Sequence, residues 1–219
     1  MPYDPSNVLG LIRASLKRTR TPTEVPAPPV IEEPIARLVY TDIGLAELFA
    51  RSAVELKMYV ELCSIDDLFE KVVDFLKEKN CKSVMLTDTP LLKNLEAAKY
   101  LNEQGIVAKM WSEITLDQSY DFDAGLTEVD YAVAETGSLV VKHRPEHGRA
   151  ISLVPFVHVA IVQPKNLVPD LLDLMEKLQK DGTGSGVTMI SGPSKTADIE
   201  MNVVIGVHGP NVVKTFVLQ

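Results

Sequence analysis

The sequence predicts an α/β protein with a largely parallel sheet that is covered on both sides. From residue 35 onward, short apolar runs rich in valine, isoleucine and leucine alternate with segments whose apolar residues have helical spacing. Most of these runs span four to six residues, which is typical of strands buried on both faces. Because strands that alternate with helices form βαβ units, we expect a three-layer sandwich around a mostly parallel, mixed sheet.

The first 34 residues differ in composition, because they hold seven of the 14 prolines. Residues 6–20 are predicted to form a short helix, since apolar residues recur there at helical spacing. The prolines that follow predict an extended linker, because proline lacks an amide donor and disfavours helix before it. We assign residues 1–34 to an N-terminal helix and proline-rich arm, and residues 35–219 to the α/β domain. The arm is either a loosely attached tail or an element that packs on a partner or a second copy, which leaves a homo-oligomer open.

The elements of the domain follow from the same patterns. Helices are expected at residues 42–55, 65–79, 90–104 and 167–180. Ser64 is the expected N-cap of the second helix, with Asp66 and Asp67 at the positive end of its dipole. Strands are expected at residues 58–62, 83–87, 106–109, 129–134, 139–142, 157–162, 187–190 and 203–206. A turn at residues 135–138, with Gly137 at a positive φ, predicts a hairpin and hence an antiparallel insertion in the sheet.

Composition and charge exclude several classes of function. The 22 basic and 30 acidic residues give a net charge of −8, which argues against a general binder of nucleic acids or anionic membranes. Two cysteines, Cys63 and Cys81, are too few for a zinc site with several thiolates or for an iron–sulfur cluster, and we expect both to be buried, inert thiols. No metal and no cofactor are therefore expected in this chain. Neither a signal peptide nor a membrane-spanning run is found, so a reducing cytoplasm is the expected location.

The segment from Ser191 to Glu200, SGPSKTADIE, carries the most informative polar pattern. It follows the expected strand at 187–190, and ligands bind at the carboxyl ends of parallel strands. Free amides at the start of a following helix would favour an anion, so one interpretation is a site for an anion or a carboxylate. The other is that Ser194 or Thr196 only caps that helix. The earlier glycine-rich segment at 181–186 lacks the ending of a phosphate-binding P-loop and is expected to be a flexible connection.

Glu135 and the four histidines are further candidates. Glu135 follows the strand expected at 129–134 and begins the turn that contains Gly137, where a carboxylate acts as a nucleophile or general base, or else anchors the hairpin through backbone amides. His208 lies in a glycine-rich turn, where it binds a ligand, exchanges protons or hydrogen-bonds the turn. His158 interrupts an apolar run and is expected to be a buried histidine with satisfied hydrogen bonds. His143 and His147 are expected to be solvated surface residues. The HExxH and GxSxG motifs of metalloproteases and hydrolases do not occur.

Four segments together resemble the LUD-domain family, of the LutC/YkgG type named for lactate utilisation. They are Ala134-Glu-Thr-Gly-Ser138, Leu153-Val-Pro-Phe-Val-His158, Gly192-Pro-Ser-Lys-Thr-Ala-Asp-Ile-Glu200 and Gly206-Val-His-Gly-Pro210. The last two motifs, in this order and spacing, are the specific ones. The resemblance covers roughly residues 45–219 and does not include the proline-rich arm.

The resemblance implies a fold like that of the NagB/RpiA/CoA-transferase group. It also implies a place in a three-protein system that oxidises L-lactate to pyruvate. The other two members of that system, the LutA-like and LutB-like proteins, are iron–sulfur proteins, so clusters are expected on those partner subunits. Two cysteines are consistent with the cluster-free member.

Three hypotheses of function follow. The first is an accessory, ligand-binding subunit in which a small anionic ligand is held by Ser191, Gly192, Ser194, Lys195, Thr196 and Asp198. Its cleft would also be lined by Glu135, Thr136, Gly137, Ser138 and His208. The second is an enzyme of the CoA-transferase or acyl-transfer kind with Glu135 as nucleophile, and here the fold does not fix the function. The third is a structural module without a small-molecule ligand.

Overall fold

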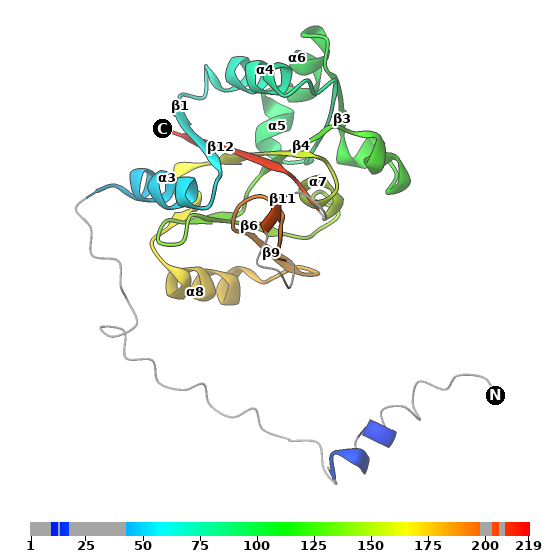
Figure 1. Cartoon of the computed structure of the whole chain (residues 1–219), viewed down its shortest axis with the longest axis vertical. Coiled ribbons are helices and arrows are strands. Elements are labelled where there is room, and N and C mark those ends of the chain that lie inside the picture. Colours follow the sequence, from blue (N-terminus) through cyan, green and yellow to red (C-terminus); the bar gives the residue numbers. More distant parts are fainter. Residues whose placement is uncertain (1–9, 13, 18–42, 198–202, 206–208) are drawn as a thin grey trace, which may run out of the picture. The chain divides into compact units, whose positions relative to one another are not determined.

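The computed structural model describes residues 10–12, 14–17, 43–197, 203–205 and 209–219 (Figure 1). The chain divides into two units, Met1–Leu38 and Val39–Gln219. In the first unit, residues 10–12 and 14–15 are helical, within the helix expected at residues 6–20. The proline-rich arm lies outside the described residues.

A six-stranded sheet, in which every pair of neighbours is parallel, is the centre of the second unit. Its strands, in spatial order, are β1 (Tyr59–Cys63), β12 (Val212–Leu218), β7 (Val157–Val162), β4 (Ala124–Glu128), β2 (Ser83–Leu86) and β3 (Val107–Met110). Strands β7 and β12 are buried along almost their whole length. The α/β class predicted from the alternation of elements is therefore confirmed.

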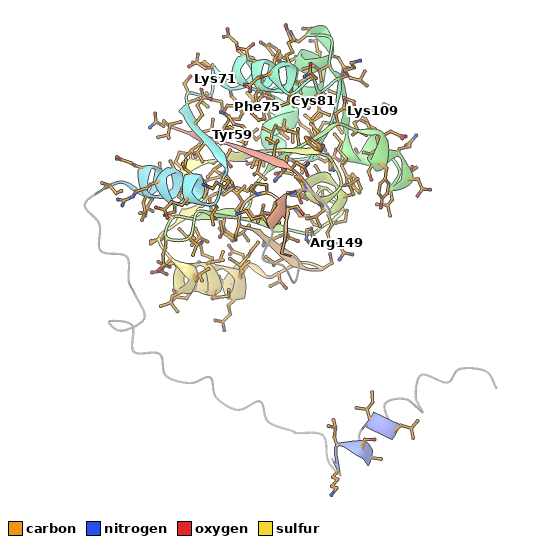
Figure 2. All side chains as sticks on the ribbon, viewed as in Figure 1. Tyr59, Lys71, Phe75, Cys81, Lys109 and Arg149 are labelled. Carbon is orange, nitrogen blue, oxygen red and sulfur yellow. The ribbon has the colours of Figure 1, made fainter. Side chains whose placement is uncertain are left out.

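Helices α4 (Leu68–Glu78), α5 (Pro90–Asn94) and α6 (Ala97–Glu103) cover one face of this sheet. Their apolar side chains, Phe75 of α4 among them, share one buried cluster with Cys81 and strand residues such as Leu86 (Figure 2). The Asp67 amide donates to the Ser64 hydroxyl at 3.2 Å, but α4 begins at Leu68 with Asp67 as its N-cap, so the N-cap predicted at Ser64 is wrong by one turn. The helix expected at 90–104 is two helices, because the chain turns at Glu96, which has a positive φ of 48°.

A second sheet, together with α3 (Leu45–Glu55), covers the opposite face. Its order is β8 (Leu167–Val168), β5 (Tyr131–Val133), β6 (Ser138–Lys142) and β9 (Val187–Ile190). Ala132, Leu139 and Phe49 of α3 share a buried cluster with Ala160 and Val217 of the parallel sheet. Helix α8 (Leu171–Asp181) packs on the outer side of the second sheet. The predicted hairpin is present as β5 and β6, although it belongs to this second sheet and not to the parallel one.

The remaining described elements are short. They are η1 (Trp111–Glu113), η2 (Asp117–Asp121), α7 (Ala150–Leu153), η3 (Pro164–Asn166), β10 (Lys195–Ala197) and β11 (Val203–Ile205). Strands β10 and β11 pair antiparallel, with Lys195 opposite Ile205. The expectation that a helix begins after Pro193 is therefore wrong for residues 195–197. Thr196 and the valines of β11 favour strand pairing, and this local preference prevails over the helix-start signal of the proline.

No helix among the described residues is both long and apolar enough to cross a membrane.

Candidate functional site

The two turns singled out in the sequence lie against each other in the structure. Strands β6 and β9 pair antiparallel with Leu139 opposite Ile190, and this register brings Ser138 next to Ser191. Their hydroxyl oxygens are 2.8 Å apart, and the Thr136 hydroxyl donates to Ser138 Oγ at 2.9 Å. A chain of three hydroxyl groups therefore connects the β5–β6 turn to the turn that follows β9.

The end of α3 supports both turns through close backbone contacts. Gly137 has a φ of 65°, and a Cβ at this position would lie 2.4 Å from the Ala53 nitrogen. Gly192 has a φ of 103°, and its Cβ would lie 2.4 Å from the Leu56 carbonyl oxygen. Only glycine combines this backbone conformation with such an approach. The two glycines predicted to bind a ligand thus fix the position of the turns against α3.

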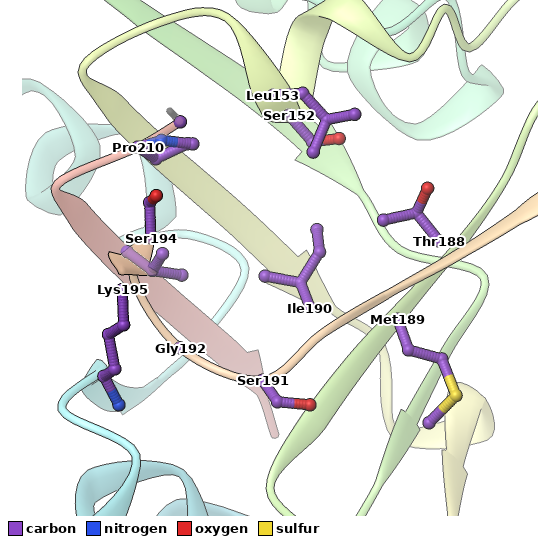
Figure 3. Close-up of a pocket in the computed structure, with 12 residues that line it drawn as sticks. Ser152, Leu153, Thr188, Met189, Ile190, Ser191, Gly192, Ser194, Lys195 and Pro210 are labelled. Carbon is purple, nitrogen blue, oxygen red and sulfur yellow. The ribbon is translucent and has the colours of Figure 1, made fainter. Parts of the chain in front are cut away.

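A cavity of about 300 Å³ lies beside the second turn (Figure 3). Its wall is formed by β9, the turn that follows it, the segment that leads into β12, and α7. Its apolar lining consists of Leu153, Met189, Ile190, Pro210 and Val213. Its hydroxyl groups belong to Ser152, Thr188, Ser191 and Ser194, and Lys195 is at its rim. The cavity therefore contains four of the residues predicted to bind an anion: Ser191, Gly192, Ser194 and Lys195.

The polar atoms of the cavity wall differ in how they are bonded. Thr188 Oγ1 lies 2.7 Å from His143 Nε2, and Ser191 Oγ contacts Ser138 as described. The Ser194 amide donates to the Pro210 carbonyl at 2.8 Å, which holds the two segments of the wall together. Lys195 Nζ donates to the Leu56 carbonyl at 3.3 Å, and Figure 3 shows its side chain extended along the rim. A cation near the carboxyl end of α3 is also favoured by the helix dipole.

The cavity does not lie where the argument from parallel sheets placed it. It is at the carboxyl end of β9, but β9 belongs to the second sheet, where it pairs antiparallel with β6. In the parallel sheet, Pro210 and Val213 place the cavity at the amino end of β12. The rule that ligands bind at the carboxyl ends of parallel strands thus does not apply here.

The structure corrects the expectation for two histidines. His143 and His147 are buried, at 5% and 0% exposure, whereas the sequence predicted solvated surface residues. The loop that follows β6 folds back on the protein, since the His143 amide donates to the Gly186 carbonyl and the Glu146 carbonyl accepts from the Asp88 amide. Burial, with a smaller contribution from Arg144, lowers the pKa of His147 to about 3. Neither ring nitrogen of His147 has a hydrogen-bond partner among the described residues.

His158 is fully buried, as predicted. Its Nε2 lies 2.8 Å from the Thr127 hydroxyl, and burial lowers its pKa to about 4. The expectation of satisfied hydrogen bonds holds for one nitrogen only, because Nδ1 has no partner within the described part of the chain. His158 faces the second sheet and α7, opposite Gly125, where a Cβ would lie 1.8 Å from the Ile151 carbonyl oxygen.

Glu135 lies in the β5–β6 turn but does not line the described cavity. Its amide donates to the Pro169 carbonyl at 3.0 Å, and its carboxylate has no hydrogen bond or ion pair to another described residue. Thr196 has a described backbone in β10, while its side chain is not described. Asp198 and His208 lie outside the described residues, so their predicted roles stay predictions.

The other polar and thiol groups have simple structural surroundings. Asp130 pairs with Arg144 at 2.7 Å, while Arg149 is exposed at the surface (Figure 2). Cys63 and Cys81 are buried free thiols, as predicted, and burial raises the pKa of Cys81 to about 11. Within the described ranges, histidine, cysteine and acidic side chains do not gather in threes in a way that would hold a metal ion.

Sequence reasoning missed the other half of the cavity. Ser152 and Leu153 belong to α7, a single short helix in a stretch without helical periodicity. Val213 is the second residue of β12, a strand that was not expected although its run of valine and phenylalanine at residues 212–218 is a strand signal. Pro210, in contrast, belongs to a motif already recognised in the sequence.

Comparisons with known proteins agree with this architecture. The sequence pattern of the LUD domain matches residues 46–218. Lactate utilization protein C of Halalkalibacterium halodurans is 29% identical over 175 residues, which cover 76% of this chain and 75% of that protein. The Escherichia coli protein YkgG, described as uncharacterized, is 33% identical over 159 residues, 68% of each chain. A DUF162 family protein from Deinococcus radiodurans has a similar fold, with a TM-score of 0.61 at 23% identity over 81% of this chain and 99% of that one.

Proposed function

Because this chain belongs to the LUD domain family, we propose that it serves in lactate utilisation as a ligand-binding subunit that works with iron–sulfur proteins. The names of its relatives support the pathway, since several are called lactate utilization protein C. Oxidation of lactate to pyruvate releases two electrons, which need a carrier. The two cysteines of this chain are buried and have raised pKa values, so they are poor cluster ligands, and a carrier on a partner subunit is the simpler arrangement.

The observation that carries the ligand-binding role is the meeting of the two family motifs beside a cavity. The hydroxyl contact between Ser138 and Ser191 joins turns that are 53 positions apart in the sequence. The second turn then supplies Ser191, Ser194 and Lys195 to the cavity wall. Hydroxyl groups and one ammonium group in the wall of a cavity are suited to a carboxylate or a similar anion.

The alternative of acyl transfer by Glu135 receives no specific support from the geometry. A nucleophile must reach the bound substrate, and Glu135 is not among the residues that line this cavity. We therefore place the ligand-binding role first and retain Glu135 as a residue of the supporting turn.

The test is an affinity purification of the tagged, full-length protein from cells of the native host grown on L-lactate. We expect cysteine-rich proteins to co-purify in fixed stoichiometry, with bound iron and the broad visible absorption of iron–sulfur clusters. A parallel culture grown on glucose and an untagged strain are the controls. A colourless protein without partners, together with normal growth on L-lactate after deletion of the gene, would contradict the proposal.

A further inference from the structure

The cavity combines an apolar lining with few polar groups. Figure 3 shows the Ser194 hydroxyl directed toward Pro210, while the Lys195 side chain extends in the opposite direction, along the rim near the Gly192 turn. Leu153, Ile190 and Val213 belong to the apolar lining. Among the lining residues that the structure describes, Lys195 is the only charged one. A ligand that matches this lining has one anionic end and an apolar body.

The polar groups of the wall differ in their remaining hydrogen-bonding capacity. Thr188 contacts His143 at 2.7 Å and Ser191 contacts Ser138 at 2.8 Å, so each hydroxyl group has one partner and keeps part of its capacity. Ser194 Oγ has no hydrogen-bond partner among the described residues, and it lies beside Pro210 (Figure 3). Lys195 is exposed, and its hydrogen bond within the described part of the chain is to a neutral carbonyl, which an anion would replace as the stronger partner. Lys195 is thus the group of this lining that is best suited to pair with an anion.

The volume of the cavity is large for a three-carbon acid. Its approximately 300 Å³ has room for about ten water-sized groups at roughly 30 Å³ each. It lies at the lower end of the range of about 300 to 1,000 Å³ that is typical of pockets for drug-sized molecules. Lactate or pyruvate bound at Lys195 would leave most of the apolar lining, formed by residues such as Leu153, Ile190 and Val213, in contact with water. The apolar contribution to affinity would then be lost, about 25 cal/mol for each Å² left exposed.

We propose that this cavity binds an amphipathic organic anion whose apolar body is considerably larger than the methyl group of lactate. Its carboxylate, or an equivalent anionic group, contacts Lys195 at the rim, and its body packs on Leu153 and Val213. This inference rests on the proposed function, in that the same cavity is taken as the ligand site. It adds that lactate itself is not the ligand.

The test is a calorimetric titration of the full-length protein with matched probes. Pyruvate and phenylpyruvate differ only in the phenyl group, while phenylacetone keeps the phenyl group and replaces the carboxylate by a methyl group. Hexanoate is a second amphipathic anion with a linear body. We expect at least one of the two amphipathic anions to bind at least tenfold more tightly than both pyruvate and phenylacetone.

Two variants assign the binding to this cavity. Lys195→Gln should weaken binding of the amphipathic anion at least fivefold and leave the affinity for phenylacetone unchanged. Leu153→Ser should weaken binding of the amphipathic anion and leave the affinity for pyruvate unchanged. The matched controls are Lys165→Gln in η3 and Phe156→Ser, both at exposed positions that do not line the cavity. The controls should bind all probes as the wild type does.

Each contrary result has a definite meaning. If neither amphipathic anion binds more tightly than pyruvate, the inference is wrong. If pyruvate binds as tightly as the amphipathic anions and Lys195→Gln weakens the binding of all of them, the inference is wrong, and the cavity is a site for small anions. If an amphipathic anion binds and neither variant weakens its binding, the anion binds elsewhere on the protein and the inference is also wrong. Failure of the proposed function is observed separately, by co-purification and growth on L-lactate.

Discussion

Gly192 combines two constraints at one residue, and they can be separated experimentally. Its φ of 103° strains any other residue type, and an added Cβ would lie 2.4 Å from the Leu56 carbonyl oxygen. Gly182 also has a positive φ, 74°, but an added Cβ would meet no atom within 4 Å. The pair therefore separates backbone strain from contact with α3.

Gly192→Ala should lower the free energy of unfolding more than Gly182→Ala does. Both substitutions introduce about 1 to 3 kcal/mol of backbone strain. Gly192→Ala should lower the free energy of unfolding by about 1 to 3 kcal/mol more than this strain does, because the Leu56 backbone must also move. Urea denaturation of both variants measures the difference, and equal losses would show that the turn does not press on α3.

Buried histidines make the stability of the protein depend on pH. His147 and His158 have folded-state pKa values of about 3 and about 4, whereas an unfolded histidine has a pKa of about 6.5. Burial also lowers the pKa of His143. At pH values between about 4 and 6.5, the unfolded state binds protons that the folded state does not bind. The free energy of unfolding therefore falls as the pH decreases below about 6.5.

Between pH 6 and pH 5, His147 and His158 together should lower the free energy of unfolding by about 2 kcal/mol, since each contributes at most about 1.4 kcal/mol per pH unit. The variant His147→Gln, which stays neutral, should lose about half as much over the same interval. Urea denaturation at the two pH values provides the measurement. An unchanged pH dependence in the variant would mean that His147 is protonated in the folded protein.

At the scale of elements, the hydroxyl chain is the connection between the two motif turns. The hydroxyl oxygens of Ser138 and Ser191 are 2.8 Å apart; Ser138 is the first residue of β6, and Ser191 directly follows β9. Ser185 donates to the His143 carbonyl and has no contact with Ser138 in the described structure, so it is a suitable reference.

In a double-mutant cycle, Ser138→Ala and Ser191→Ala should be coupled by about 0.5 to 1.5 kcal/mol, the usual net contribution of a hydrogen bond. The control cycle of Ser138→Ala with Ser185→Ala should be additive, because the two residues share no partner. Free energies of unfolding from urea denaturation give both values. Additivity in the first cycle would contradict a direct connection between the turns.

Local patterns predicted the elements well where each element had its own signal. Helix α4 has an apolar stripe, and β7 is a nearly continuous apolar run. The sequence could not show that the expected helix at 90–104 turns at Glu96, because a glutamate rarely has a positive φ. It also could not show that residues 195–197 pair with β11, since that pairing depends on a strand several positions away.

At the scale of the whole molecule, the sequence predicted the class of fold but not how the sheets divide. The alternation of strands and helices is a local property, whereas the separation of β5, β6, β8 and β9 into a second sheet depends on long-range packing. For the same reason, one side of the cavity was predicted and the other was not. The turn after β9 carries a recognisable motif, but α7 and β12 reach the cavity only through the tertiary structure.

The most direct measurement is growth on L-lactate of a host strain that lacks the gene and carries Leu153→Trp or Phe156→Trp in its place. Leu153 lines the cavity and is 42% exposed, so tryptophan can occupy the cavity with little strain on the core. Phe156, at 58% exposure, lies nearby in the chain but does not line the cavity. We expect Leu153→Trp to abolish growth and Phe156→Trp to restore it, with equal amounts of folded protein. Normal growth with Leu153→Trp would contradict the central claim that this cavity is the functional site.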